Sequence, residues 1–142
     1  MSGGYLSGLR LRMAGYRVPM TTRTSLLHMA LPEDWDAARS TGTYTASTRG
    51  VTIAEQGFMH GSWDADQTLR VWDFAYSDRP DVVITEIDLA ALADAGLTVR
   101  EEPGDPSDPA SERFPHVYGG DVPVRLMRER AGGIEALRAQ LC

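Results

Sequence analysis

The sequence predicts a single small α+β domain, with a mixed or antiparallel sheet and flanking helices. A length of 142 residues is typical of one domain. Hydrophobic residues make up 42% of the chain and charged residues 24%, which is ordinary for a globular protein and excludes a disordered one. Strand-like segments follow one another closely and helices separate only some of them, which favours α+β over a regular βαβ series.

The first predicted elements are a strand and a helix. Residues 26–30 (LLHMA) form a short apolar run of the kind found in buried strands. The next helix begins at Pro32, a residue favoured in the first turn, and ends at Gly42, a favoured C-terminal residue. Residues 43–51 are rich in threonine and serine, and predict either a ragged strand or a loop.

A second strand is predicted over 57–62 (GFMHGS). Successive side chains of a strand point to opposite faces, so Phe58, His60 and Ser62 share one face. A helix over about 64–77 follows, and its apolar residues recur at helical spacing.

The C-terminal half contains the clearest strand, DVVITEID at 81–88. The acidic, proline-rich residues 102–109 predict a surface loop. The remaining elements are a short helix, a strand, two extended segments and a closing amphipathic helix, predicted over 89–95, 97–101, 114–118, 122–127 and 134–141 respectively.

Residues 1–24 have no clear period and predict a weakly ordered extension, so we place the domain at 25–142. Arginines and glycines interrupt this segment, which lacks the apolar core of a secretory signal. No apolar run approaches the roughly 18 residues that a membrane span needs. The single cysteine, Cys142, excludes a disulfide framework. We expect a cytoplasmic protein with no membrane partner.

The charge distribution argues against long nucleic acids as partners. Residues 1–30 hold four arginines and no acids, which leaves ten arginines against twenty acids in the rest of the chain. Such an acidic body repels a phosphate backbone, although a small nucleotide held by local groups remains compatible with it. The chain has no lysine, which excludes a lysine nucleophile.

Each of the three histidines lies in a short apolar, strand-like segment: His28 in LLHMA, His60 in GFMHGS and His116 in FPHVYG. A buried imidazole needs hydrogen-bond partners, so three separate core histidines would need three separate sets. Convergence on one polar cleft is more economical. Ser62 and Tyr118, which share strand faces with His60 and His116, would add hydroxyl groups to it.

These segments also carry a family resemblance. The order and spacing of LLHMA, GFMHGS, DVVITEID and FPHVYG resemble the bacterial domain-of-unknown-function family 952 (DUF952), over about residues 26–126. That family is similar in fold to the ADP-ribosyltransferases and RNA 2′-phosphotransferases. The resemblance therefore implies an ADP-ribosyltransferase-like fold and NAD as a cofactor.

The resemblance also implies roles for residues. A histidine on the first strand of those relatives bonds a ribose hydroxyl of NAD, and the following backbone amide holds the nicotinamide carboxamide. His28 and Met29 match these positions. A His-x-Ser pattern on the second strand matches His60 and Ser62. For the carboxylate that steadies the ribose in the reaction, Glu102 is the preferred counterpart, ahead of Glu101 and Glu86. The expected catalytic residues are His28, His60 and Glu102, and the expected ligand-binding residues are Met29, Ser62, His116 and Tyr118.

Two alternatives remain open beside an NAD-dependent transferase or phosphotransferase-like enzyme. One is a non-catalytic module that binds a nucleotide or a modified residue, because no glutamate motif follows FPHVYG. The other is a hydrolase in which three histidines hold zinc. None of the histidines has the i,i+4 spacing of helical zinc ligands, so no metal is predicted.

Overall fold

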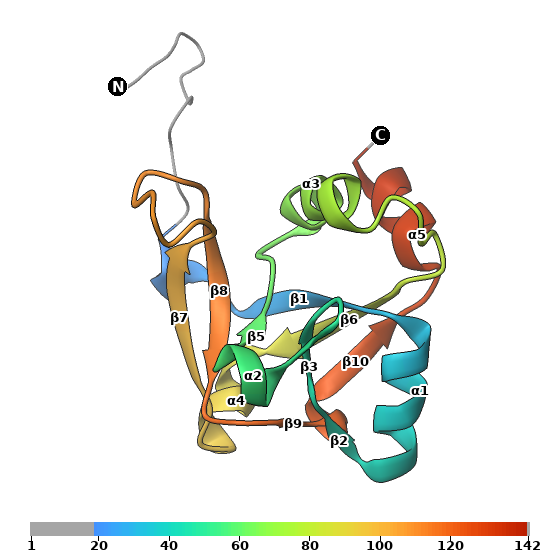
Figure 1. The fold of residues 1–142 in the computed structure, drawn as a ribbon, viewed down its shortest axis with the longest axis horizontal. Coiled ribbons are helices and arrows are strands. Elements are labelled where there is room, and N and C mark those ends of the chain that lie inside the picture. Colours follow the sequence, from blue (N-terminus) through green and yellow to red (C-terminus); the bar gives the residue numbers. More distant parts are fainter. Residues whose placement is uncertain (1–18, 142) are drawn as a thin grey trace, which may run out of the picture.

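One three-stranded sheet forms the centre of the protein in the computed structural model, which describes residues 19–141 (Figure 1). Its strands are β1 (Ser25–Ala30), β6 (Val83–Asp88) and β10 (Met127–Arg130), in the order β1-β6-β10. Both pairings are antiparallel. The central β6 is the strand predicted at 81–88.

A second three-stranded sheet lies beside the first and consists of β5 (Met59–His60), β8 (Arg113–Tyr118) and β7 (Thr98–Pro103), in the order β5-β8-β7. Its pairings are also antiparallel. β7 is longer than predicted, because Glu102 and Pro103 pair with β8 and do not begin the loop.

Two short two-stranded pairings complete the strands of the described residues, one of them between distant segments and one a hairpin. β2 (Thr43–Tyr44) pairs with β9 (Val122–Pro123), and β3 (Ala46–Thr48) pairs with β4 (Val51–Thr52). The ragged segment predicted at 43–51 is thus three short strands. The extended segment predicted at 122–127 is interrupted by a single 3-10 turn before β10.

Five helices flank the strands within residues 19–141, and local sequence explains their ends. α1 begins at Pro32 and ends before Gly42, whose φ of 87° is the left-handed conformation that glycine favours. α3 begins after Asp64, whose side chain accepts a hydrogen bond from the Gln67 N–H. The helices are α1 (Pro32–Thr41), α2 (Ile53–Gln56), α3 (Ala65–Ala75), α4 (Leu89–Asp94) and α5 (Gly133–Gln140). No helix of the described chain is long and apolar enough to cross a membrane.

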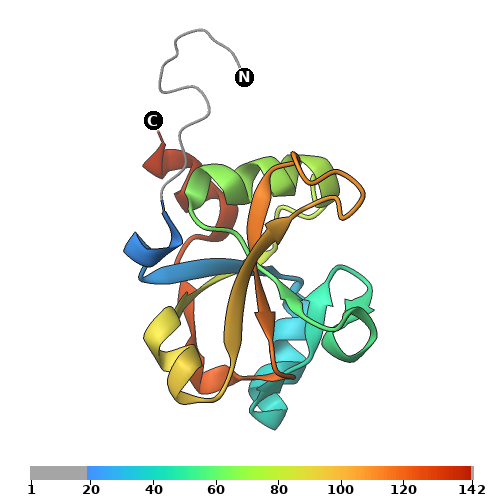
Figure 2. The same cartoon turned by 90° about the vertical axis from the view of Figure 1, so that its left-hand side faces the viewer.

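The core has two parts because β1 is buried on both faces. Leu26 and Ala30 pack into a cluster with residues of α1 and α4. Leu27 and Met29 pack into a second cluster with residues of α3 and α5. Figure 2 shows the same division, with α3 and α5 beyond one side of β1 and α1 and α4 beyond the other. A strand covered on both sides needs a continuous apolar run, which explains LLHMA.

The last residues of the predicted N-terminal extension contact the domain. The Arg23 guanidinium lies 5.0 Å from the centre of the Trp63 ring and 3.6 Å from the Asp64 carboxylate. The Thr24 carbonyl accepts a hydrogen bond from the Leu89 N–H. The remainder of the extension, 1–18, lies outside the described residues.

Candidate functional site

A cavity of about 240 Å³ opens where the two main sheets meet. It lies between the edge of β1, the turn after β5, the hairpin of β3 and β4, and the C-terminal half of α3. Most of its surface is apolar. The residues that line it include His28, Met29, His60, Ser62, Phe74 and Tyr76.

The sheets are joined by one pair of main-chain hydrogen bonds. The Leu27 N–H donates to the Ser62 carbonyl at 2.7 Å, and the Ser62 N–H donates back to Leu27 at 2.8 Å. The chain reaches this point through Gly61. A Cβ atom there would lie 3.1 Å from both a Leu26 methyl group and the Pro115 carbonyl, which explains why glycine precedes the junction.

Beyond this junction, the main chain of Met29 faces the cavity. Along an antiparallel strand, the residues whose N–H and C=O point to one neighbour alternate with those that point to the other. Leu27 turns these groups toward Ser62, so Met29, opposite Ile84 in the register with β6, turns its own groups to the same open edge. They have no hydrogen-bond partner among residues 19–141. The edge therefore presents one donor and one acceptor.

The His28 ring is buried, and both of its nitrogens are engaged. Nδ1 lies 2.6 Å from the main-chain oxygen of His60, and Nε2 lies 2.7 Å from the Tyr44 hydroxyl. Since a carbonyl can only accept, Nδ1 carries the proton and Nε2 accepts from Tyr44. Burial lowers the pKa of His28 to about 4 despite the bond to His60, so the ring is neutral. His28 holds β1 to β5 and has no ring nitrogen left for a ligand.

His60 is the histidine with free nitrogens at the cavity. Its ring is half-buried, and neither nitrogen has a hydrogen-bond partner among the described residues. Burial lowers its pKa to about 4, with smaller contributions from His116 and His28. A neutral imidazole can accept one hydrogen bond and donate another, which suits a polar ligand group.

His116, Glu102 and Tyr118 form a polar cluster next to the cavity, on the face of the second sheet that bears His60. His116 is directly opposite His60 in the strand register, and their ring centres are 4.9 Å apart. One Glu102 oxygen, Oε1, accepts hydrogen bonds from His116 Nδ1 at 2.9 Å and from the Tyr118 hydroxyl at 2.6 Å. None of the three lines the cavity.

The contacts of this cluster set its charges. Burial alone would raise the pKa of Glu102, but the hydrogen bonds from Tyr118 and His116 outweigh it and lower the pKa. Burial lowers the pKa of His116, although Glu102 opposes the change. Burial and the bond to Glu102 raise the pKa of Tyr118. At neutral pH the cluster is therefore an ionised carboxylate that accepts from a neutral imidazole and a neutral phenol.

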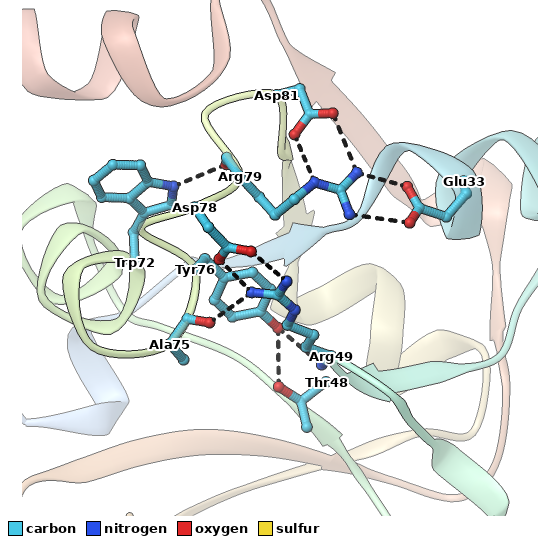
Figure 3. Close-up of polar contacts among 9 residues, drawn as sticks. All are labelled: Glu33, Thr48, Arg49, Trp72, Ala75, Tyr76, Asp78, Arg79 and Asp81. Carbon is cyan, nitrogen blue, oxygen red and sulfur yellow. Dashed lines mark hydrogen bonds and ion pairs between the residues drawn. The ribbon is translucent and has the colours of Figure 1, made fainter.

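A network of polar contacts fixes the cavity wall formed by Tyr76 (Figure 3). The Tyr76 hydroxyl is 2.9 Å from the Thr48 hydroxyl and accepts from the Arg49 N–H at 2.9 Å. The Arg49 guanidinium in turn forms two bonds to the Asp78 carboxylate, at 2.6 and 2.7 Å. These contacts join the hairpin of β3 and β4 to the end of α3.

A second arginine extends the network to α1. Arg79 donates to both carboxylate oxygens of Glu33, at 3.1 and 2.8 Å, and to both oxygens of Asp81, at 3.0 and 3.1 Å. Figure 3 shows its guanidinium between the two acids. The loop between α3 and β6 is thus attached to two neighbouring elements.

The structure brings together part of the predicted site. His28, Met29, His60 and Ser62 line one cavity, whereas the polar cluster of Glu102, His116 and Tyr118 lies beside it.

The two other candidate carboxylates lie elsewhere. Glu101 accepts from the Trp63 indole N–H at 2.8 Å. Glu86, on the first sheet, accepts from Ser25, Arg128 and Arg130.

Sequence reasoning missed Ser47, Phe74, Tyr76 and Phe114 as cavity residues. Phe74 offered a signal. It lies off the apolar stripe of its helix, and it is 92% exposed in the structure. An exposed phenylalanine beside a cavity is the kind of feature that marks a binding surface. Tyr76 is buried and also lines the cavity.

The three-histidine zinc arrangement has no counterpart in the geometry. Within residues 19–141, no group of three or more His, Cys, Asp or Glu side chains is placed to hold a metal ion. The engagement of both His28 nitrogens is consistent with this finding.

Comparison with known proteins finds similar solved structures and a matching family. Two solved structures match, those of protein CC0527 from Caulobacter crescentus and of a double mutant of it. They are 21% and 20% identical to this chain, both with a TM-score of 0.59, and each match covers 81% of this chain and 99% of the other. This likeness concerns the fold alone. No functionally curated protein matches.

The model of a family described as "Protein of unknown function (DUF952)" matches residues 29–129. The chain therefore belongs to the DUF952 family.

Proposed function

We propose that this protein handles a small nucleotide-like ligand, with NAD as the first candidate, in the cavity where the two sheets meet. The observation that supports the proposal most is the main chain of Met29, whose free N–H and C=O face the cavity near His60. A carboxamide or a nucleobase edge offers the complementary acceptor and donor side by side. From the family resemblance, we expect the nicotinamide carboxamide at this position.

The size and lining of the cavity suit one end of such a ligand. Its volume of about 240 Å³ is below the roughly 300–1,000 Å³ of pockets that enclose a drug-sized molecule. It would accommodate a single planar ring with its polar substituent, while the rest of a dinucleotide extended along the surface. Phe74 and Phe114 supply apolar area at the cavity for that ring.

An ADP-ribosyltransferase-like reaction would use the polar cluster. Breaking a bond between a ribose and a base develops positive charge on the ribose, and a nearby carboxylate stabilises that charge. Glu102 is ionised, because the hydrogen bonds from Tyr118 and His116 lower the pKa of its carboxyl group. Glu102 lies beside the cavity and not in its lining. It can act in this way only if the ribose extends past His60 toward β7.

A non-catalytic nucleotide-binding module is the second candidate, and one observation favours it. The Oε1 atom of Glu102 is held by two internal hydrogen bonds, and Glu102 does not line the cavity. A protein that only binds its ligand would not need this carboxylate to reach the ribose.

A thermal-shift experiment tests the proposal. NAD, nicotinamide, ADP-ribose and AMP are added separately to the wild-type protein, because a ligand that binds only the native state raises the melting temperature. We expect a rise of several degrees with NAD that is lost in His60→Ala and kept in Arg128→Ala, which changes an exposed residue of the other sheet. If none of the four compounds shifts the wild-type protein, the proposal is wrong.

A further inference from the structure

The imidazole of His116 has an unusual unsatisfied atom. Its Nε2 is buried and has no hydrogen-bond partner among the described residues, while Nδ1 is bonded to Glu102. Buried polar atoms in proteins are nearly always paired, so an orphan atom requires an explanation. With Nδ1–H donating to the carboxylate, Nε2 is the unprotonated nitrogen and retains a free lone pair.

The Phe58 ring covers one face of this imidazole. The two rings stack with their centres 4.1 Å apart and an angle of 22° between their planes. The ring of His60 meets Phe58 edge-on at 4.9 Å and meets His116 edge-on at 4.9 Å. One face of His116 is therefore covered by a phenyl ring, and the histidine that lines the cavity lies against it.

The Phe58 side chain is placed so that it can move without its backbone. Its carbonyl accepts a hydrogen bond from the buried Ser47 hydroxyl, which fixes the main chain. Its side chain is only half-buried. A rotation about the side-chain bonds would uncover the stacked face of the His116 ring and leave the strand in place.

We propose that His116, supported by the Glu102 carboxylate, is a general base that the Phe58 ring covers. It becomes accessible from the cavity when this ring rotates away. The substrate class is a hydroxyl group, from a ligand in the cavity or from water beside it. The O–H bond breaks, its proton passes to Nε2, and the electron pair stays on the oxygen, which becomes the nucleophile. The Glu102 carboxylate stabilises the imidazolium that forms, as the carboxylate of a triad does. This inference does not depend on the ligand being a nucleotide.

The surroundings suit a base of this kind. The titratable groups that face His116 are His60 from β5, Tyr118 on its own strand, and Glu102 and Arg100 from β7. Arg100 lies over the Tyr118 ring at 4.3 Å and contributes to lowering the Glu102 pKa, which keeps the carboxylate ionised.

Diethyl pyrocarbonate tests the inference without any ligand. An unprotonated imidazole nitrogen attacks its carbonyl carbon and expels ethyl carbonate, which leaves as carbon dioxide and ethanol. Modification of each histidine is followed by peptide mass spectrometry. We expect His116 to react slowly in the wild-type protein and at least about tenfold faster in Phe58→Ala. His28, whose nitrogens are both engaged, should stay unreactive in both.

Two further variants separate a covered base from a structural histidine. Phe58→Tyr retains the ring and should leave the rate at His116 unchanged. Adding Glu102→Gln to Phe58→Ala should lower that rate several-fold, because the carboxylate makes Nε2 more basic.

Circular dichroism checks that each variant is folded. If Phe58→Ala does not fold, the long-range 15N spectrum of the wild-type protein must still show His116 with a proton on Nδ1 only. Rapid modification of wild-type His116, no gain in folded Phe58→Ala, no effect of Glu102→Gln, or a proton on Nε2 would each overturn the inference.

Discussion

Nδ1 of His28 lies 2.6 Å from the main-chain oxygen of His60, and this contact links the first sheet to the second beside the candidate site. It lies next to the main-chain pair between Leu27 and Ser62. The same imidazole is bonded on its other side to the Tyr44 hydroxyl, inside the core. His28 therefore positions His60 and the open edge of β1, and its role is one of architecture.

Removing the His28 ring should destabilise the protein strongly. His28→Ala leaves a cavity and an unpaired Tyr44 hydroxyl, and we expect a loss of about 2–4 kcal/mol in the free energy of unfolding. Tyr44→Phe should cost about 1–3 kcal/mol, because it leaves Nε2 unpaired. Urea denaturation of both variants and of the double variant measures their coupling. Fully additive losses would show that the bond between them contributes nothing.

The buried His28 also predicts a dependence of stability on pH. Its pKa is lowered by burial from 6.5 to about 4, so the unfolded chain binds a proton between these values and the folded protein does not. Stability is therefore complete above about pH 6.5 and is lost as the pH falls toward 4. From His28 alone we expect a loss of roughly 2 kcal/mol between about pH 7.5 and about pH 5. Denaturation curves that coincide at these two pH values would contradict a neutral buried imidazole.

The Tyr76 hydroxyl should matter for the hairpin of β3 and β4 more than for the whole fold. Tyr76→Phe removes the bonds to Thr48 and to the Arg49 N–H, and we expect a loss of about 1 kcal/mol. Hydrogen exchange of the hairpin amides should become faster, because this cavity wall is no longer attached. Unchanged exchange of the Arg49 amide would contradict its hydrogen bond to the Tyr76 hydroxyl.

Glu102→Gln distinguishes an enzyme from a binding module. A group that acts mainly on the transition state lowers turnover and leaves ground-state binding nearly intact. We therefore expect NAD affinity within a few-fold of the wild type and the loss of most nicotinamide release. Wild-type protein that binds NAD and releases no nicotinamide, with or without candidate acceptors, would favour the module that only binds.

Local sequence patterns predicted most elements of the fold, because the signals for helix ends and buried strands lie within a few neighbouring residues. Proline and glycine define the ends of α1, and the apolar run LLHMA predicts a strand covered on both faces. The helix α2 was missed because it is only four residues long. Thr52 and Glu55 form the capping box that begins it, which would have been its sequence signal.

The candidate site was predictable only in part because its geometry depends on long-range contacts. The sequence predicted that the histidines converge, and His60 does lie against both His28 and His116. It could not predict that His28 would use both nitrogens internally, since Tyr44 is sixteen residues away. Nor could it place Phe58 on His116, which requires the register of β5 with β8.

The main-chain amide of Met29 provides the most direct test of the proposed function. Its 15N–1H signal is followed by NMR while NAD, nicotinamide or ADP-ribose is added to the wild-type protein. We predict that NAD and nicotinamide shift the Met29 signal strongly, whereas ADP-ribose, which lacks the carboxamide, does so much less. A Met29 signal that stays in place at concentrations of NAD that move other signals to saturation would contradict the account.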